Sequence, residues 1–96
     1  MSNYYPVSAV IGNKIKSLRK NKGLSLITLA KTVGISEQQQ LRYERGNNRI
    51  SVDRLKQYSN YFDINISYFF RLVTMKKQKL KMVMKLKNHF LYSIFT

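Results

Sequence analysis

The first apolar residues along the chain recur at helical spacing. Ile11, Ile15 and Leu18 are four and three residues apart, which places them on one side of a helix. Pro6 closes a short N-terminal arm ahead of this pattern, and Gly23 has the residue type that often ends a helix. We therefore expect a first helix between these two residues that buries one apolar stripe.

Two shorter segments follow, each opened by a serine and closed by a glycine. Ser25 and Ser36 are suitable N-cap residues, because the hydroxyl oxygen accepts a hydrogen bond from an N–H of the first helical turn. Gly34 and Gly46 are suited to the ends of the same two segments. The inward stripe of the first segment consists of Leu26, Leu29, Ala30 and Val33. We expect the second segment to be a helix over residues 37–45.

Two further helices are predicted after a polar, basic loop. Ser51 can cap a fourth helix, and Asn65 can cap a short fifth one. The positions on one side of the fourth helix are Val52, Leu55, Tyr58, Ser59 and Phe62, and the fifth carries Ile66, Phe69 and Phe70. No segment combines strand alternation with turn chemistry. The sequence therefore predicts an all-α fold with a five-helix domain over residues 1–70.

The composition changes beyond this domain. Residues 71–96 contain seven basic residues (Arg71 and six lysines) and no acidic residue, whereas residues 1–70 contain 11 basic and 4 acidic residues. Leu80, Val83 and Phe90 follow a rough helical spacing within this region. We therefore expect a basic C-terminal helix or tail over residues 71–96.

The charge of the whole chain points to a polyanionic partner. Its 96 residues include 18 basic and 4 acidic side chains, which gives a net charge of +14. Cationic side chains displace the counterions that condense on a phosphate backbone, so nucleic acid is the leading partner. The absence of cysteine excludes disulfides, thiolate metal sites and cysteine nucleophiles. The N-terminal residues do not resemble a signal peptide and no apolar run reaches membrane-spanning length, so we expect a cytoplasmic protein without a membrane partner.

The sequence shows no group of residues suited to catalysis. His89 has no second histidine, cysteine or nearby acid to complete a metal site, and Asp53 and Asp63 are isolated rather than paired. No Gly-rich phosphate loop occurs, and no serine has a credible general base. We therefore expect no enzymatic activity, no metal, no cofactor and no small-molecule ligand.

Residues 26–45 have the pattern of a helix-turn-helix. This motif packs two short helices at a steep angle across a tight turn. Ala30 supplies the small side chain needed where the helices approach, and Gly34 suits a turn whose backbone conformation is costly for other residues. Helix 37–45 would then be free to enter a major groove with its N-terminal residues facing the base edges.

Over residues 11–70 the chain resembles the phage-repressor, Cro-like or XRE helix-turn-helix group. The segments that carry this resemblance are Lys22–Ser25, Leu29–Ala30, Val33–Ser36 and Tyr43–Gly46. Several motifs in the correct order are more specific than one short motif. The resemblance implies a lambda-repressor-like domain that binds double-stranded DNA and regulates transcription at the bacterial nucleoid.

Residues 36–44 are most similar to regulators encoded with enterobacterial fimbrial operons, which implies control of adhesion and motility genes. The chain departs from that signature at Glu37, where the signature has glutamine, and Leu26 replaces a glutamine that often binds phosphate. Gln40 stands where an apolar residue normally anchors the recognition helix, and Leu41 where a small polar residue is usual. Two arrangements are open: Leu41 rotates inward as the anchor, or Gln40 sits partly exposed over a weakened core.

The motif positions and their chemistry assign candidate DNA contacts. Gln38 can pair with adenine and Arg42 with guanine through two hydrogen bonds each. Glu37 can accept a hydrogen bond from cytosine or act as a favourable charge at the helix N-terminus. The candidates for base contact are Glu37, Gln38, Leu41 and Arg42, and those for phosphate contact are Ser36, Gln39, Arg45, Asn47, Asn48 and Arg49. Lys14 and Lys22 are weaker candidates for phosphate contact.

Some of these residues have a second role in the same prediction. Ser36 is expected to cap the recognition helix whether or not it contacts phosphate. Gln39 lies about 100° around the helix from Gln38, so a supporting role is as plausible as a phosphate contact. The family resemblance implies that Arg19 and Glu44 form an internal ion pair between the first and third helices.

The resemblance and the surplus of apolar residues also predict a homodimer on a two-fold operator. One alternative is an antitoxin-type DNA-binding protein that uses its tail to bind a partner protein. Another is a tail that binds RNA or a membrane surface, because its lysines are interleaved with apolar residues.

Overall fold

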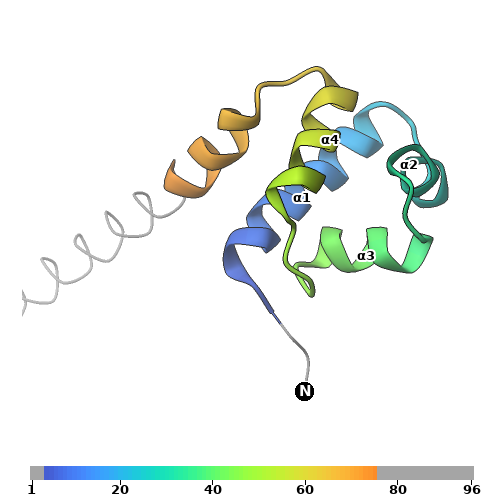
Figure 1. The fold of residues 1–96 in the computed structure, drawn as a ribbon, viewed down its shortest axis with the longest axis horizontal. Helices are drawn as coiled ribbons and strands as arrows, with labels where there is room; N and C mark the ends of the chain where they lie inside the picture. The colour runs from blue at the N-terminus through green and yellow to red at the C-terminus, as the bar shows by residue number, and fades with distance from the viewer. Residues whose placement is uncertain (1–3, 76–96) are drawn as a thin grey trace, which may run out of the picture.

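The computed structural model describes residues 4–75, and all of its regular secondary structure is helical over that range. Helices α1 (Pro6–Asn21), α2 (Leu26–Val33), α3 (Glu37–Arg45) and α4 (Val52–Phe62) are followed by a fifth helix that runs from residue 66 to residue 75, the last one described. Figure 1 shows α2 and α3 joined by a tight turn, with α3 along one edge of the domain. The predicted all-α, five-helix fold is confirmed.

Serine caps and glycine ends define the short helices, as the sequence predicted. The hydroxyl oxygens of Ser25, Ser36 and Ser51 accept hydrogen bonds from backbone N–H groups three residues ahead, at 3.2, 3.0 and 3.1 Å. Gly34 ends α2 with φ of 79° and Gly46 ends α3 with φ of 75°. This left-handed conformation is strained for residues that carry a Cβ atom, which explains why glycine occupies both positions.

The apolar stripes of the helices meet in a single core. Its fully buried members include Ile15, Leu29, Tyr58 and Phe69, which come from α1, α2, α4 and helix 66–75. Val52 is a correction to the predicted stripe of α4, because it is 64% exposed. It is the first residue of that helix, three positions before Leu55, the first residue of α4 that is buried.

The close approach of α1 to α3 depends on glycine. A Cβ atom built on Gly12 would lie 1.9 Å from the carbonyl oxygen of Tyr43, so no larger residue fits without separating the two helices. At the far end of α3, the N–H of Tyr5 donates to the carbonyl of Gly46 at 2.9 Å. A Cβ atom on Gly46 would in turn lie 2.5 Å from that of Ala9. The C-terminal half of α3 is therefore fitted tightly against the N-terminal half of α1.

Arg54 connects α4 to the helix-turn-helix. Its Nη1 atom donates to the carbonyl oxygen of Val33, 2.8 Å away in the last turn of α2, where backbone carbonyls lack helical partners. The same nitrogen donates to the Oε1 atom of Gln57, also at 2.8 Å. This contact holds the end of α2, and thus the turn that leads into α3, against the body of the domain.

Helix 66–75 spans residue 70, at which the sequence predicted the end of the five-helix domain and the start of the basic tail. Phe69 is buried in the core, and Val73 packs against it from beyond residue 70. The predicted tail therefore begins as part of a helix that contacts the domain, and its remainder, residues 76–96, lies outside the described residues. Over residues 4–75, no helix has the length and apolar character needed to cross a bilayer.

Candidate nucleic-acid interface

Helix α3 has two chemically different faces. Gln40, Tyr43 and Glu44 are buried against the rest of the domain. The other face consists of Glu37, Gln38, Leu41, Arg42 and Arg45, of which Leu41 is half-buried and the rest are exposed. Residues four apart lie one above the other on a helix, so these five side chains form one continuous outward surface, here called the α3 outer face.

The structure brings the four candidates for base contact together on this surface. Gln38 and Arg42 are four residues apart and so are Glu37 and Leu41, which makes two adjacent rows. An exposed glutamine amide and an exposed guanidinium can each form two hydrogen bonds with the edge of a base. Glu37 lies in the first turn of α3, where its negative charge also interacts favourably with the helix dipole.

The candidates for phosphate contact lie at the two ends of α3. Ser36 precedes the helix and is exposed, and its hydroxyl oxygen accepts the capping bond from the N–H of Gln39. The side chain of Gln39 is half-buried. Arg45 is exposed at the C-terminal end of the helix, and the loop after it contains Arg49, with half-buried Asn47 and Asn48 between them. Phosphate groups flank the groove on both sides, so donors at both ends of a recognition helix fit the function expected of them.

Aromatic rings contact three of the basic side chains. The guanidinium carbon of Arg49 lies 4.9 Å from the ring centroid of Tyr5, which restrains the loop after α3. Lys14 and Lys22, the weaker candidates for phosphate contact, lie 5.5 Å and 4.7 Å from the ring centroids of Tyr68 and Tyr61. These rings belong to helix 66–75 and α4, so the two lysines are directed at elements other than α3.

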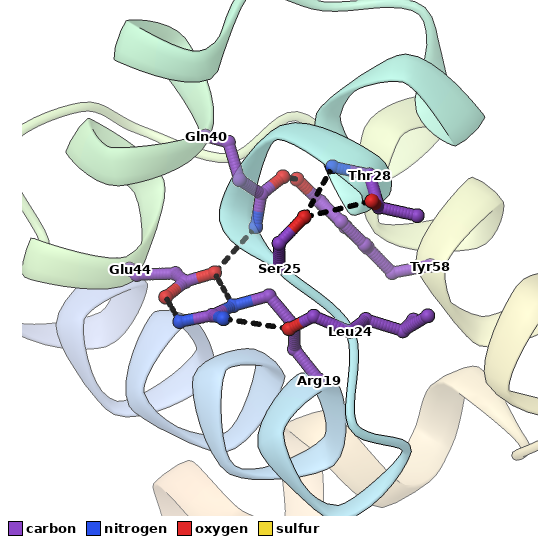
Figure 2. Close-up of polar contacts among 7 residues, drawn as sticks. All are labelled: Arg19, Leu24, Ser25, Thr28, Gln40, Glu44 and Tyr58. Atoms are coloured by element: carbon purple, nitrogen blue, oxygen red, sulfur yellow. Dashed lines mark hydrogen bonds and ion pairs between the residues drawn. The ribbon is translucent and has the colours of Figure 1, made fainter.

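Arg19 and Glu44 form an ion pair that joins α1 to α3 (Figure 2). Arg19 donates through Nε to Glu44 Oε2 at 2.9 Å and through Nη2 to Oε1 at 3.0 Å. The remaining Nη1 atom donates to the carbonyl oxygen of Leu24 at 2.9 Å. The side chains are 11% and 2% exposed, so the pair is shielded from water and salt.

Gln40 is where sequence reasoning was wrong. Both predicted arrangements fail, because Gln40 is 0% exposed and Leu41 is half-buried on the outer face. The physical reason is that both ends of the buried amide have partners: Nε2 donates to Glu44 Oε2 at 2.8 Å, and Oε1 accepts from the hydroxyl of Tyr58 at 2.5 Å. Within residues 4–75, no buried side-chain nitrogen or oxygen is left without a hydrogen-bond partner. A polar anchor has replaced the apolar one.

Tyr58 is held as a hydrogen-bond donor. Burial raises the pKa of its hydroxyl above the ordinary value of 10.0, and the neighbouring Tyr43 and Glu44 raise it further, which together outweigh the lowering effects of Arg54 and of the bond with Gln40. The ring is fully buried and meets the ring of Tyr43 edge to face, with centroids 6.5 Å apart. The raised pKa favours the protonated hydroxyl, which is the form that donates to Gln40.

The sequence predicted Tyr58 as a core position but did not predict the role of its hydroxyl. The signal available was the pairing of a polar residue in an inward position of α3 with a tyrosine, rather than a phenylalanine, in an inward position of α4. A buried glutamine needs two partners, so such a tyrosine is a natural candidate for one of them. Arg54 was also missed, since nothing local marks it as the partner of a carbonyl 21 residues away.

Comparisons with known proteins identify the family to which this domain belongs. A family model described as helix-turn-helix matches residues 15–69. An uncharacterized HTH-type transcriptional regulator of Rickettsia conorii is 47% identical over 64 residues, which cover 67% of this chain and 51% of the relative. The chain spans about half the length of the curated relatives it matches.

Solved structures share the fold. The clp gene regulator ClgR of Corynebacterium glutamicum superposes with a TM-score of 0.64 at 20% identity, covering 73% of this chain and 91% of that one. The restriction-modification controller protein C.AhdI of Aeromonas hydrophila gives a TM-score of 0.61 at 28% identity, with coverage of 68% and 98%. Because the family model covers more than half of the chain, this protein belongs to the helix-turn-helix family, and the relatives that it matches are named HTH-type transcriptional regulators.

Proposed function

We propose that the protein is a sequence-specific transcriptional regulator that places α3 in the major groove of double-stranded DNA. The observation that carries this proposal is the division of α3 into two faces. Gln40, Tyr43 and Glu44 hold it to the domain, and within residues 4–75 the α3 outer face is directed away from that contact. A helix presented in this way fits the width of a major groove.

Within this proposal, the outer face reads bases and the flanking residues bind phosphate. Gln38 and Arg42 pair with adenine and guanine, Leu41 contacts a thymine methyl group, and Glu37 accepts from cytosine. Phosphate contacts come from Ser36, Gln39, Arg45, Asn47, Asn48 and Arg49. The net charge of +14 adds attraction that does not depend on sequence and that weakens as salt increases.

Selection of genomic DNA fragments by the full chain, followed by sequencing, tests the proposal directly. A recurrent site that competes against bulk DNA at constant salt would support a sequence-specific regulator. Fragments recovered without any shared sequence would limit the protein to electrostatic binding. The recovered duplex then serves as the probe for the variants below.

Replacing Arg42 by alanine tests the assignment of base contacts. We expect Arg42→Ala to lose about 1–3 kcal/mol of binding to the selected duplex and to relax its preference at one base pair. The matched control is Lys56→Ala, which removes one positive charge from an exposed position on α4. Fluorescence anisotropy against duplexes with single base-pair changes measures both. An equal loss on every duplex would instead make Arg42 a phosphate ligand.

The proposed active form is a homodimer on a two-fold operator with half-sites about 34 Å apart. Phe70 and Met75, exposed apolar side chains of helix 66–75, support a contact between copies in that region. Light scattering after size exclusion should give twice the 11.4 kDa of one chain for the free protein, or the mass of the duplex plus two chains for the complex. The mass of one chain for the free protein, together with that of the duplex plus one chain for the complex, would contradict the dimer.

The remaining parts of the proposal concern the location of the protein in the cell and the genes that it regulates. A regulator that acts on DNA would work in the cytoplasm at the nucleoid and would have no enzymatic activity of its own. Control of fimbrial or motility genes rests only on the resemblance of residues 36–44, since the relatives and structures described above carry no such name. In the antitoxin-type alternative the tail binds a partner protein, and residues 76–96 of that tail lie outside the described residues.

A further inference from the structure

We propose that Tyr58, although it lies on α4 behind the recognition helix, is a positioning residue for base readout. It acts through Gln40, to which its hydroxyl donates at 2.5 Å, and so fixes the rotation of α3 about its axis. The inference rests on the proposed function of the α3 outer face, and extends it to a residue that is not expected to touch DNA.

The first step in the argument is that α3 is held by directed bonds from two sides. Arg19 on α1 binds Glu44, Glu44 accepts from Gln40, and Gln40 accepts from Tyr58 on α4 (Figure 2). Apolar contacts are non-directional and tolerate small rotations, whereas a hydrogen bond weakens steeply when its angle departs from linearity. A chain of such bonds therefore specifies one rotation of the helix.

The second step is the place of Gln40 between the candidate base-reading residues. Gln38 and Arg42 lie two positions before and after it, about 200° around the helix in either direction. Their side chains therefore point outward when the amide of Gln40 points inward. Functional groups must be held to within about 10–20° of their productive orientation, so the rotation fixed at Gln40 decides whether both side chains reach their base edges.

The third step is that Tyr58 itself cannot follow a rotating helix. Its ring is fully buried and belongs to the core together with Leu55 and Phe62 of the same helix. Arg19, at the other end of the chain of bonds, is restrained by its further bond to the carbonyl oxygen of Leu24. Both ends belong to elements other than α3, so removal of the Tyr58 hydroxyl releases one side of that helix.

The test compares Tyr58→Phe with Tyr61→Phe in the full chain. Both remove one hydroxyl from α4, but that of Tyr61 makes no hydrogen bond within the described residues. At a temperature well below either melting point, we expect Tyr58→Phe to weaken binding to the selected duplex about three- to tenfold, because a rotated α3 loses part of one base contact. Affinity for poly(dI-dC) should be unchanged, and Tyr61→Phe should match the parent protein on both probes.

Residual dipolar couplings of the α3 amides measure the orientation of the helix without DNA. They should change relative to those of α1 in Tyr58→Phe and remain unchanged in Tyr61→Phe. If both the couplings and the ratio of specific to non-specific affinity stay at parental values while only the melting point falls, Tyr58 is a packing residue and the inference is overturned. Failure of the parent chain to select any sequence would defeat the proposed function, whereas the couplings would still decide the positioning role.

A second variant keeps the inference testable should Tyr58→Phe not fold. The double variant Gln40→Leu with Tyr58→Phe removes the amide and the hydroxyl together. Glu44 Oε2 loses the bond from Gln40 but still accepts from Arg19 Nε, so no buried polar atom is left without a partner. We expect this variant to fold with an apolar anchor and to show the same loss of sequence preference. Parental preference in the double variant would show that shape alone positions α3, which contradicts the proposal.

Discussion

Gly12→Ala is expected to destabilise the protein by about 3 kcal/mol or more, near the upper range for overpacking a tight contact. Elsewhere inside a helix, the same substitution stabilises by about 1 kcal/mol, because glycine has more backbone freedom to lose on folding. Here the new Cβ atom would lie 1.9 Å from the carbonyl oxygen of Tyr43 and 3.2 Å from the Cα atom of Glu44. Neither is the movable end of a side chain, so α1 and α3 would have to separate.

Urea denaturation followed by circular dichroism measures this effect. Asn13→Ala is the matched control, since Asn13 is the next residue of α1 and is exposed. That variant should be as stable as the parent or slightly more stable, because alanine has the higher helix propensity. Equal stability of Gly12→Ala and Asn13→Ala would mean that the two helices are farther apart than the structure places them.

Glu44→Ala should cost about 3–5 kcal/mol, the usual result of removing one partner from a buried ion pair. The guanidinium of Arg19 would keep its bond to the carbonyl of Leu24 but lose both bonds to the carboxylate. Gln40 Nε2 would lose its acceptor in a site without water access. Since small domains have a total stability of about 5–15 kcal/mol, this variant should be partly unfolded at moderate temperature.

A double-mutant cycle separates the interaction energy of the ion pair from the cost of leaving one buried charge without its partner. Arg19→Met with Glu44→Leu removes both charges and should be more stable than the sum of the two single changes predicts. Glu37→Ala is the control within the same helix, because that acid is exposed at its first turn and its loss should change stability by less than about 1 kcal/mol. A small effect of Glu44→Ala, similar to that of Glu37→Ala, would contradict the central role of the pair.

Local features of the fold could be predicted from sequence because their causes are local. Ser25, Ser36 and Ser51 bond to N–H groups three residues ahead, and Gly34 and Gly46 supply backbone conformations at single positions. The end of α4 is the exception: Asp63 adopts the left-handed conformation with φ of 54°. Aspartate adopts that conformation more readily than most residues, but much less commonly than glycine, so it gave no clear stop signal.

What could not be predicted depends on contacts between distant segments. Gly12 is a weak helix former in isolation, and only the passage of Tyr43 beside it explains its presence. Gln40 is polar, so the sequence alone favours an exposed position for it. Its burial is explained only by the hydrogen bond from Tyr58, 18 residues further along the chain. The division of α3 into two faces was predictable from spacing, whereas the atoms that fix its rotation were not.

The polar anchor also restricts how this regulator can evolve. Exchange of Gln40 for an apolar residue leaves the hydroxyl of Tyr58 without its acceptor, and exchange of Tyr58 for phenylalanine leaves the amide without its donor. Each single step passes through a less stable protein, although the two together restore a consistent core. Lineages with this glutamine and tyrosine should therefore keep or lose them as a pair, while the outward positions of α3 remain free to diverge toward new operators.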